Sequence, residues 1–162
     1  FSLIFKLIKK HFKNKKIIIG AYYPSYYEVN ILKLLQEASK KKFKIVLPVI
    51  KTSSLMSFKI WIPNEPLYVS KFGILEPKST NKGFTPDVII VPLVTFDSQL
   101  NRIGYGKGYY DRKLKKIKKI KRNAICIGVA HSFQKSESIP TNKHDFKLDY
   151  IFTERGIISS RK

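Results

Sequence analysis

The sequence has few of the residues that mark disulfide-stabilised, zinc-binding or membrane-spanning proteins. It contains one cysteine, Cys126, in 162 residues, which excludes an internal disulfide framework and a cysteine-rich zinc site. The apolar neighbours of Cys126 predict a buried, unreactive thiol. No apolar run reaches the roughly 18 residues that a transmembrane helix needs, and Lys6, Lys9 and Lys10 interrupt the apolar start of the chain. We therefore expect a cytoplasmic protein that does not associate with membranes.

Acidic residues are also scarce. Eleven Asp and Glu stand against 32 Lys and Arg, a formal net charge of +21. Such an excess attracts polyanions, so a basic α/β protein that binds nucleic acid through Lys113–Arg122 is one alternative. The lysines, however, are spread over every expected element, and Ile, Asn, Phe and Tyr are abundant as well. This joint excess indicates a compositional bias of the source, and we expect no nucleic-acid partner.

Apolar residues recur at helical spacing in some segments and form short continuous runs in others. The content of 43% hydrophobic and 13% aromatic residues predicts a folded domain with a real core. Helical spacing is found at 1–13, 29–40 and 113–121. Buried strands are expected at 17–23, 45–50, 88–94, 124–130 and 150–153, of which the last closes the series.

The middle of the chain follows a different pattern. Residues 55–62 alternate in polarity, with Trp61 on the polar side, which predicts a half-buried strand at an edge or in a hairpin. Residues 63–87 contain four prolines and two glycines and are expected to form a long loop with at most short strands. Loops of this length in compact domains are usually functional or mobile.

Strands that alternate with helices favour parallel pairing, because a helix is the usual crossover between parallel neighbours. We therefore predict one three-layer α/β domain over residues 1–162, with a mainly parallel central sheet and a small antiparallel insertion around residues 55–75. The first helix begins at Phe1 with no Met and no capping residue before it. We expect the chain to start part-way into an element, with a segment missing on its N-terminal side.

The most informative segment runs from the strand at 88–94 through Gly104, Gly106 and Gly108 into the next helix. Ligands of open α/β sheets lie at the carboxyl ends of strands, where glycines let the backbone approach them closely. The first N–H groups of the following helix are unpaired and suit an anion such as phosphate. The spacing fits neither the Walker loop nor the dinucleotide-binding fingerprint. Two interpretations stay open, a phosphate or nucleotide site and a tight strand-to-helix turn.

Charged residues flank these glycines. Arg102 offers a planar fork for phosphate oxygens, and Lys107 supplies a compact, mobile charge. Asp111 lies in the first turn of the helix, where it is either a capping carboxylate or an oxygen ligand for Mg²⁺ beside bound phosphates. Asp145 is a second candidate ligand, whereas Asp149 is better explained as the end of the loop before the last strand.

The segment Arg102–Asp111, RIGYGKGYYD, preceded by Val91-Pro92 and Phe96-Asp97, resembles the signature of the 5-formyltetrahydrofolate cyclo-ligases, also called methenyltetrahydrofolate synthetases. The resemblance extends in order over about residues 15–157. The further matching segments are Ala21–Pro24 with Glu28, Val46–Pro48, Gly73–Pro77, His144-Asp145, Leu148-Asp149 and Thr153-Glu154.

The resemblance implies a ribose-phosphate isomerase or CoA-transferase-like fold and a reaction in which ATP and Mg²⁺ convert 5-formyltetrahydrofolate to 5,10-methenyltetrahydrofolate, with release of ADP and phosphate. It assigns Arg102 and Lys107 as catalytic residues, Tyr23 and Glu28 to the folate, and Asp111 and Asp145 to Mg²⁺. The residues that would cradle the ATP phosphates are Arg102, Ile103, Gly104, Tyr105, Gly106, Lys107, Gly108, Tyr109 and Tyr110. A monomer is favoured.

Two departures from the family pattern stand out. The family begins with a further N-terminal helix whose Lys and Arg side chains contact ATP, and Lys6, Lys9 and Lys10 fall on the helix after it. Leu93 stands where the family has glycine, a change that would narrow the space near the nucleotide. A truncated or inactive relative of the enzyme is therefore a further alternative.

Overall fold

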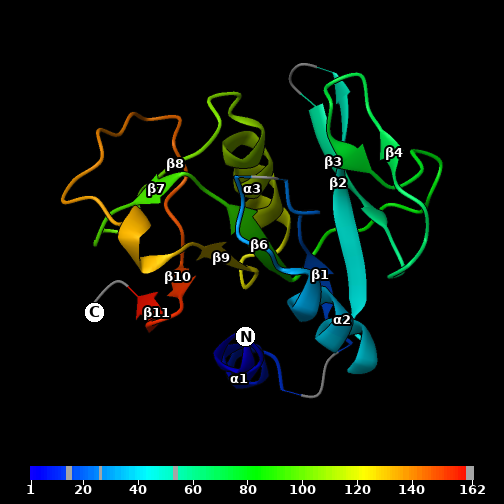
Figure 1. The fold of residues 1–162 in the computed structure, drawn as a ribbon, viewed down its shortest axis with the longest axis horizontal. Helices are drawn as coiled ribbons and strands as arrows, with labels where there is room; N and C mark the ends of the chain where they lie inside the picture. Colours follow the sequence, from blue (N-terminus) through cyan, green and yellow to red (C-terminus); the bar gives the residue numbers. More distant parts are fainter. Residues whose placement is uncertain (14–15, 26, 53–54, 160–162) are drawn as a thin grey trace.

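The computed structural model describes residues 1–13, 16–25, 27–52 and 55–159. Its centre is a seven-stranded sheet (Figure 1). The strands of this sheet are β1 (Ile18–Gly20), β2 (Lys44–Thr52), β3 (Leu55–Ile60), β6 (Val88–Pro92), β9 (Ile125–Val129), β10 (Tyr150–Thr153) and β11 (Gly156–Ser159). They lie in the order β11-β10-β9-β6-β1-β2-β3.

The sheet is mainly parallel, as predicted. Strand β1 pairs in parallel with both β2 and β6, and the parallel ladder continues from β6 through β9 to β10. Strands β3 and β11 are the antiparallel edges. The predicted antiparallel insertion consists of β3 and a separate two-stranded pair, β4 (Tyr68–Val69) with β5 (Leu75–Glu76).

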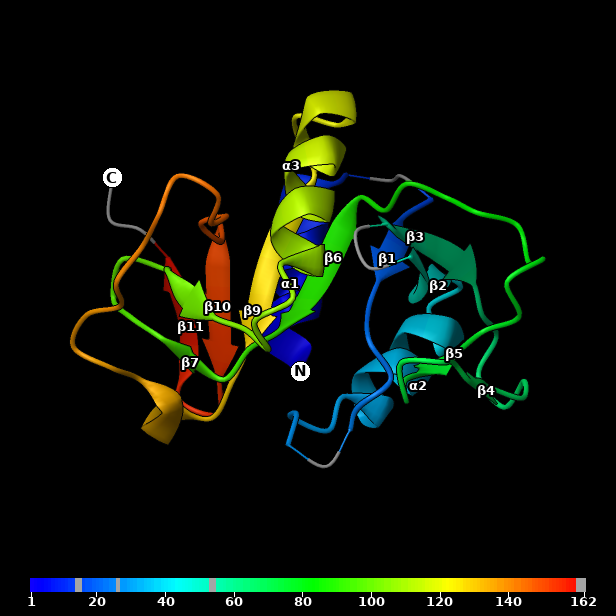
Figure 2. The ribbon, with the colours of Figure 1, turned by 90° about the horizontal axis from the view of Figure 1, so that it is seen from above.

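Helices cover both faces of the sheet, which confirms the three layers (Figure 2). On one face, α1 (Ser2–His11) and α2 (Leu32–Lys40) contribute Ile4, Ile8 and Leu35 to a core that includes Ile19 of β1. On the other face, α3 (Tyr109–Ile120) packs Leu114 and Ile117 in a second core. Each helix buries one apolar stripe against the sheet. Within the described residues, no helix combines the length and the apolar character that crossing a membrane requires.

Several element boundaries differ from the sequence predictions. Strand β1 is shorter than the predicted 17–23: it ends at Gly20, after which Ala21 N still donates to Val46 O of β2 at 2.9 Å. Helix α2 begins at Leu32 rather than at residue 29. Just before this start, the side chain of Asn30 accepts a hydrogen bond from Leu32 N at 3.0 Å. The prediction that 150–153 is the last strand was wrong, since β11 follows it as an antiparallel edge strand.

Three side chains lie on faces opposite to those that their spacing predicts. Trp61 is buried and Ile62 is exposed, because β3 ends at Ile60 and the alternation of its side chains stops there. The ring of Trp61 instead packs edge-to-face on Tyr23, with centroids 6.1 Å apart. Ile120, predicted as part of the apolar face of α3, is 70% exposed at the last residue of that helix.

Candidate active site

The strand order reverses its direction between β1 and β6, at the centre of the sheet. From β1 the chain moves outward to β2 and β3, then returns to β6 and moves outward in the other direction through β9, β10 and β11. Ligands of open α/β sheets bind at such a reversal point, outside the carboxyl ends of the strands. The segments that follow these ends are 21–31 after β1 and 93–108 after β6. Both contain residues that the sequence singled out.

The glycine turn follows a short hairpin after β6. Strands β7 (Thr95–Phe96) and β8 (Arg102–Ile103) form this hairpin, and Gly104–Gly108 then leads into α3. Gly106 and Gly108 have φ angles of 80° and 62°, which glycine adopts without strain. A Cβ atom on Gly104 or Gly106 would have no atom within 4 Å, so open space lies in front of the turn. This space lies next to the start of α3, and the first N–H groups of a helix have no partner within the helix, so the arrangement suits a phosphate.

Arg102 lies inside this arrangement rather than on its surface. Its side chain is 4% exposed. One terminal nitrogen, Nη1, donates to Asp111 Oδ1 at 2.9 Å and to the carbonyl of Phe146 at 3.0 Å. The Nε atom is buried and has no hydrogen-bond partner within the described part of the chain. The guanidinium therefore joins β8, α3 and the segment before β10, and keeps one donor for a bound group.

Asp111 contacts the residue that follows the other predicted magnesium ligand, Asp145. Asp111 Oδ1 also accepts a hydrogen bond from Phe146 N at 2.9 Å, a nitrogen of the peptide that links Asp145 to Phe146. The exposed carboxylate of Asp145 accepts from Asn142 N at 2.8 Å. Across the described residues, no three His, Cys, Asp or Glu side chains converge as a metal cluster. The donor set therefore fits Mg²⁺ only as an ion bound largely by phosphate oxygens and water, which is its usual state in phosphoryl-transfer sites.

A hairpin from elsewhere in the chain contacts the end of the glycine turn. Phe72, in the turn between β4 and β5, packs edge-to-face on Tyr109 with centroids 6.4 Å apart. The ammonium group of Lys107 lies 5.6 Å from the centroid of the same Phe72 ring. Buried Glu76 fastens this hairpin to β2 by accepting a hydrogen bond from Ile50 N at 2.9 Å. Within the described ranges, none of the ion pairs involves Lys107, so its charge is available to an anion.

Glu28 approaches the glycine turn from the β1 side. Its carboxylate accepts a hydrogen bond from Ser25 N at 2.9 Å, and burial raises its pKa despite the Ser25 hydrogen bonds that lower it. The charge of Glu28 also acts on Tyr105 and Tyr110: burial is the main reason that the pKa of each phenol is raised, and the Glu28 carboxylate raises it further. The hydroxyl of Tyr110 is buried and unpaired within the described residues. Tyr23, in contrast, packs on Trp61.

One residue of the site was quoted in the sequence without a role. Asp97 is 2% exposed, and its carboxylate accepts hydrogen bonds from Gln99 N, Asn101 N, Asn101 Nδ2 and Ile139 N. These bonds fix the turn that delivers Arg102 to β8. An Asp that begins a loop and bonds backbone N–H groups further along the chain is typical of such turns, and this was the available signal.

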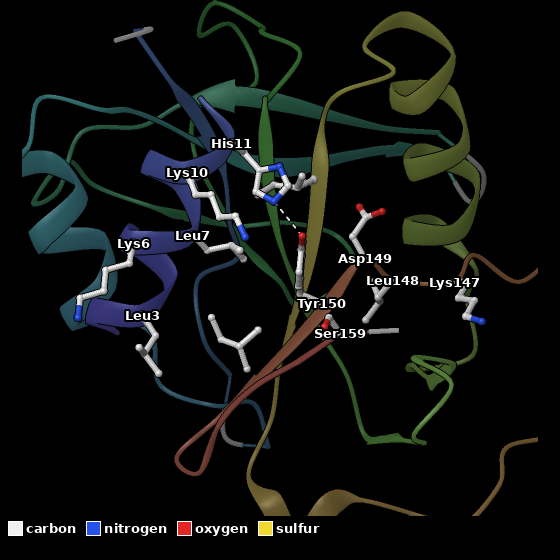
Figure 3. Close-up of a pocket in the computed structure, with 12 residues that line it drawn as sticks. Leu3, Lys6, Leu7, Lys10, His11, Lys147, Leu148, Asp149, Tyr150 and Ser159 are labelled. Atoms are coloured by element: carbon white, nitrogen blue, oxygen red, sulfur yellow. Dashed lines mark hydrogen bonds between the residues drawn. The ribbon is translucent and has the colours of Figure 1, made fainter. Parts of the chain in front are cut away.

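A groove of about 990 Å³ lies elsewhere, between α1 and strands β10 and β11 (Figure 3). It is lined by Leu3, Leu7 and Lys147 among others, and His11 Nε2 lies 2.8 Å from Tyr150 OH across it. The predicted site residues are not among those that line it. This groove is therefore separate from the reversal point between β1 and β6.

Asp149 also lines this groove, and its carboxylate has structural partners. It bonds Lys118 Nζ at 2.8 Å and accepts from Cys126 N at 2.8 Å. This confirms that Asp149 ends the loop before β10. Burial, followed by the nearby Asp149, raises the pKa of the Cys126 thiol to about 12, which confirms an inert, buried cysteine.

The model of the 5-formyltetrahydrofolate cyclo-ligase family matches residues 2–154. The 5-formyltetrahydrofolate cyclo-ligase of Haemophilus influenzae is 32% identical over 136 residues, which cover 80% of this chain and 72% of the relative. The probable 5-formyltetrahydrofolate cyclo-ligase of Schizosaccharomyces pombe is 31% identical, with 81% and 71% covered.

Two solved structures of methenyltetrahydrofolate synthetases have a similar fold. The NMR structure of Aquifex aeolicus 5,10-methenyltetrahydrofolate synthetase superposes with a TM-score of 0.76 at 31% identity, covering 99% of this chain and 81% of that one. The 5,10-methenyltetrahydrofolate synthetase of Mycoplasma pneumoniae has a TM-score of 0.68 at 24% identity, which supports the fold. A family match over nearly the whole chain, relatives above 30% identity and a shared fold agree with one another. The chain belongs to the 5-formyltetrahydrofolate cyclo-ligase family.

Proposed function

We propose that the chain converts 5-formyltetrahydrofolate to 5,10-methenyltetrahydrofolate with ATP and Mg²⁺, in the crevice between the carboxyl ends of β1 and β6. The observation that carries this proposal is the glycine turn between Arg102 and Asp111, which has open space in front of Gly104 and Gly106 and leads into the N-terminus of α3. Family membership supplies the reaction class, and the turn supplies a place for the phosphates.

In this proposal the ATP phosphates lie along residues 102–110. The backbone N–H groups of the turn and of the first residues of α3 bind phosphate oxygens. Lys107 adds a mobile positive charge, and the buried Nε of Arg102 adds a fixed donor. Tyr109, which is 8% exposed and packed in the second core, supports the turn from beneath. Asp111 and Asp145 would hold a Mg²⁺ ion that neutralises charge on the phosphates.

The folate lies across from the glycine turn, against the segment after β1 that holds Tyr23 and Glu28. The ring of Tyr23 forms the apolar part of this wall with Trp61. The Glu28 carboxylate accepts hydrogen bonds and is available to N–H groups of the pteridine. Because burial raises the pKa of Glu28, its charge is stabilised by a ligand that donates to it.

The reaction then needs positioning and charge neutralisation rather than a protein nucleophile. The formyl oxygen attacks the γ-phosphorus of ATP, and ADP leaves. Folate N10 next attacks the activated formyl carbon, the bond from that carbon to oxygen breaks, and phosphate departs with the oxygen. N10 loses its proton as the five-membered ring closes. Arg102 and Lys107 hold the phosphoryl oxygens throughout, and Phe72 packs on Tyr109 at the end of the glycine turn.

The test is the absorbance of the methenyl product, measured with the chain alone, with ATP and with ATP plus Mg²⁺. We expect product only when ATP and Mg²⁺ are both present. Thermal unfolding with either substrate separates the remaining outcomes, because a ligand that binds the folded state raises the melting temperature. Stabilisation without product indicates an inactive relative, and the absence of both contradicts the proposal.

A monomer in the cytoplasm that binds no nucleic acid completes this proposal. The net charge of +21 then acts on anionic substrates instead of on a polymer. Salt-sensitive binding of generic DNA, without stabilisation by 5-formyltetrahydrofolate, would favour the nucleic-acid alternative.

A further inference from the structure

The turn that carries Glu28 connects β1 to α2, and Ala21 N at its start donates to Val46 O of β2 at 2.9 Å. It begins where β1 ends at Gly20 and finishes where α2 begins at Leu32. Inside it, Glu28 is bonded to Ser25: Ser25 N donates to the Glu28 carboxylate at 2.9 Å, and Glu28 N donates to Ser25 O at 3.1 Å. These bonds shape the turn, but they do not attach it to another element.

A side-chain hydrogen bond within the turn connects its start, which is buried in the core, to the residue after Glu28. The hydroxyl of Tyr22 donates to the carbonyl of Val29 at 2.9 Å. Tyr22 is 3% exposed and packs in the core between the sheet and helices α1 and α2. A phenol hydroxyl at such a position needs a partner, since leaving it unpaired costs free energy. The Val29 carbonyl is that partner, and it belongs to the residue directly after Glu28.

The position of this bond fixes the path of the backbone at Glu28. Tyr22 lies two residues after β1, and its ring is held by the core, so its hydroxyl is a fixed point. Because Val29 is bound to that point and directly follows Glu28, the bond restricts the backbone at Glu28, whose charge acts on Tyr105 and Tyr110.

We infer that Tyr22 is a positioning residue for the folate: its hydroxyl holds Val29, and thereby Glu28, in the binding geometry, without contact with either substrate. The inference rests on the proposed role of Glu28. Electrostatics agrees with the placement. Burial is the main cause of the raised pKa of Tyr22, and the charge of Glu28 raises it further, as it does for Tyr105 and Tyr110 of the opposite wall.

The test is Tyr22→Phe, which keeps the ring in the core and removes only the hydroxyl. Loss of one buried hydrogen bond that acts on the geometry of Glu28 should raise the KM for 5-formyltetrahydrofolate about five- to tenfold. The KM for ATP and the kcat should stay within about twofold, because the glycine turn is untouched. A purely structural role of Tyr22 predicts a lower melting temperature with both KM values unchanged.

Tyr150→Phe is the matched control. Its hydroxyl is hydrogen-bonded to His11 in the groove of Figure 3, away from the crevice. The same atom is removed, and both KM values should stay at the wild-type level. If Tyr22→Phe changes the two KM values equally, or changes neither, the inference is wrong.

Glu28→Gln and the double variant Tyr22→Phe/Glu28→Gln separate this inference from the function on which it rests. If Tyr22 acts through Glu28, adding Tyr22→Phe to Glu28→Gln should raise the folate KM less than about twofold further. A fully multiplied effect overturns the inference and leaves the role of Glu28 intact. No effect of Glu28→Gln on the folate KM overturns the proposed role of Glu28, and the inference with it.

Discussion

At the scale of single residues, the site depends on one buried ion pair. Arg102 Nη1 and Asp111 Oδ1 are 2.9 Å apart, and the side chains are 4% and 21% exposed. The sequence assigned Arg102 to phosphate and Asp111 to Mg²⁺ as separate roles. In the structure each of these residues orients the other, and both are bonded to Phe146. Removing the charge of either residue therefore leaves the charge of the other without its partner.

Arg102→Ala and Asp111→Asn should each lower the rate of ATP-dependent ring closure at least about tenfold, equivalent to about 1.4 kcal/mol. Arg102→Lys should fall in the same range, because an ammonium group keeps the charge but not the planar fork that reaches both Asp111 and Phe146 O. The measurement is the initial rate of methenyl formation, for variants that retain the wild-type circular dichroism spectrum. Near-normal turnover in folded variants would contradict the assigned roles.

Asp97 should contribute stability that depends on pH. Burial alone would raise its pKa, but hydrogen bonds from Asn101, Gln99 and Ile139 outweigh burial, and the pKa is lowered from the usual 3.8. A lowered carboxyl pKa gives stability that is present above the unfolded-state value and is lost as the pH falls through the folded-state value. Asp97→Asn should therefore reduce the free energy of unfolding by about 2–3 kcal/mol at neutral pH, and by less near pH 3.

Urea unfolding at the two pH values measures this difference. Asp145→Asn is a suitable control, since Asp145 is exposed and its carboxylate accepts from Asn142 N. An equal loss of stability for Asp97→Asn at both pH values would show that the carboxylate charge is not the cause.

At the scale of elements, the close packing of β9 against the loops around it leaves no room for a side chain at Gly128. A Cβ atom there would lie 2.6 Å from Leu148 Cδ1 and 2.8 Å from Leu93 Cδ2. Leu93, the residue that departs from the family pattern, is 2% exposed and belongs to the second core. Its bulk is therefore accommodated over Gly128.

Gly128→Ala should lower the free energy of unfolding by about 1–3 kcal/mol through overpacking, and Leu93→Ala by about 2–4 kcal/mol through the cavity that it leaves. The double variant should be more stable than the sum of these effects predicts, because the new methyl group occupies part of that cavity. Urea unfolding gives all three values. Gly83→Ala is the control, since a Cβ there meets its nearest atom, Phe58 O, at 3.4 Å. Strict additivity would rule out the shared space.

The elements that sequence spacing predicts well are those with a repeated apolar face. Leu114 and Ile117 of α3 are buried as expected, and β10 has the predicted bounds. Strands β7, β8 and β11 were not predicted. Strands β7 and β8 have two residues each, which is too few to show a period, and β11 is an edge strand that pairs with β10. The contact between Phe72 and Tyr109 joins distant segments, and spacing along the chain does not show it.

At the scale of the whole molecule, the sequence predicted the class of sheet but not the order of its strands. That order determines which loops face one another, and it brings Glu28 to the same edge of the sheet as the glycine turn. Local propensity does not predict such strand pairings, since they depend on contacts between residues far apart in the sequence. The resemblance to a known family indicated the candidate site residues, whereas the structure shows which loops carry them and how these loops are arranged.

The same strand order divides the sheet into two halves that meet at β1. This strand has three register pairs with β2 and two with β6. In hydrogen exchange with MgATP and 5-formyltetrahydrofolate added, the amides of β1 and its flanking ladders should gain more protection than those of α1, because a ligand held by both walls opposes separation of the halves. Equal protection in both regions would contradict this expectation.

The narrow junction at β1 also has a consequence for inhibition. A compound that binds only at the glycine turn leaves the two halves of the sheet free to separate at β1. A compound long enough to reach Glu28 as well binds both halves and opposes their separation. The residence time of a compound should then depend more on whether it contacts both halves than on the number of contacts that it makes with either one.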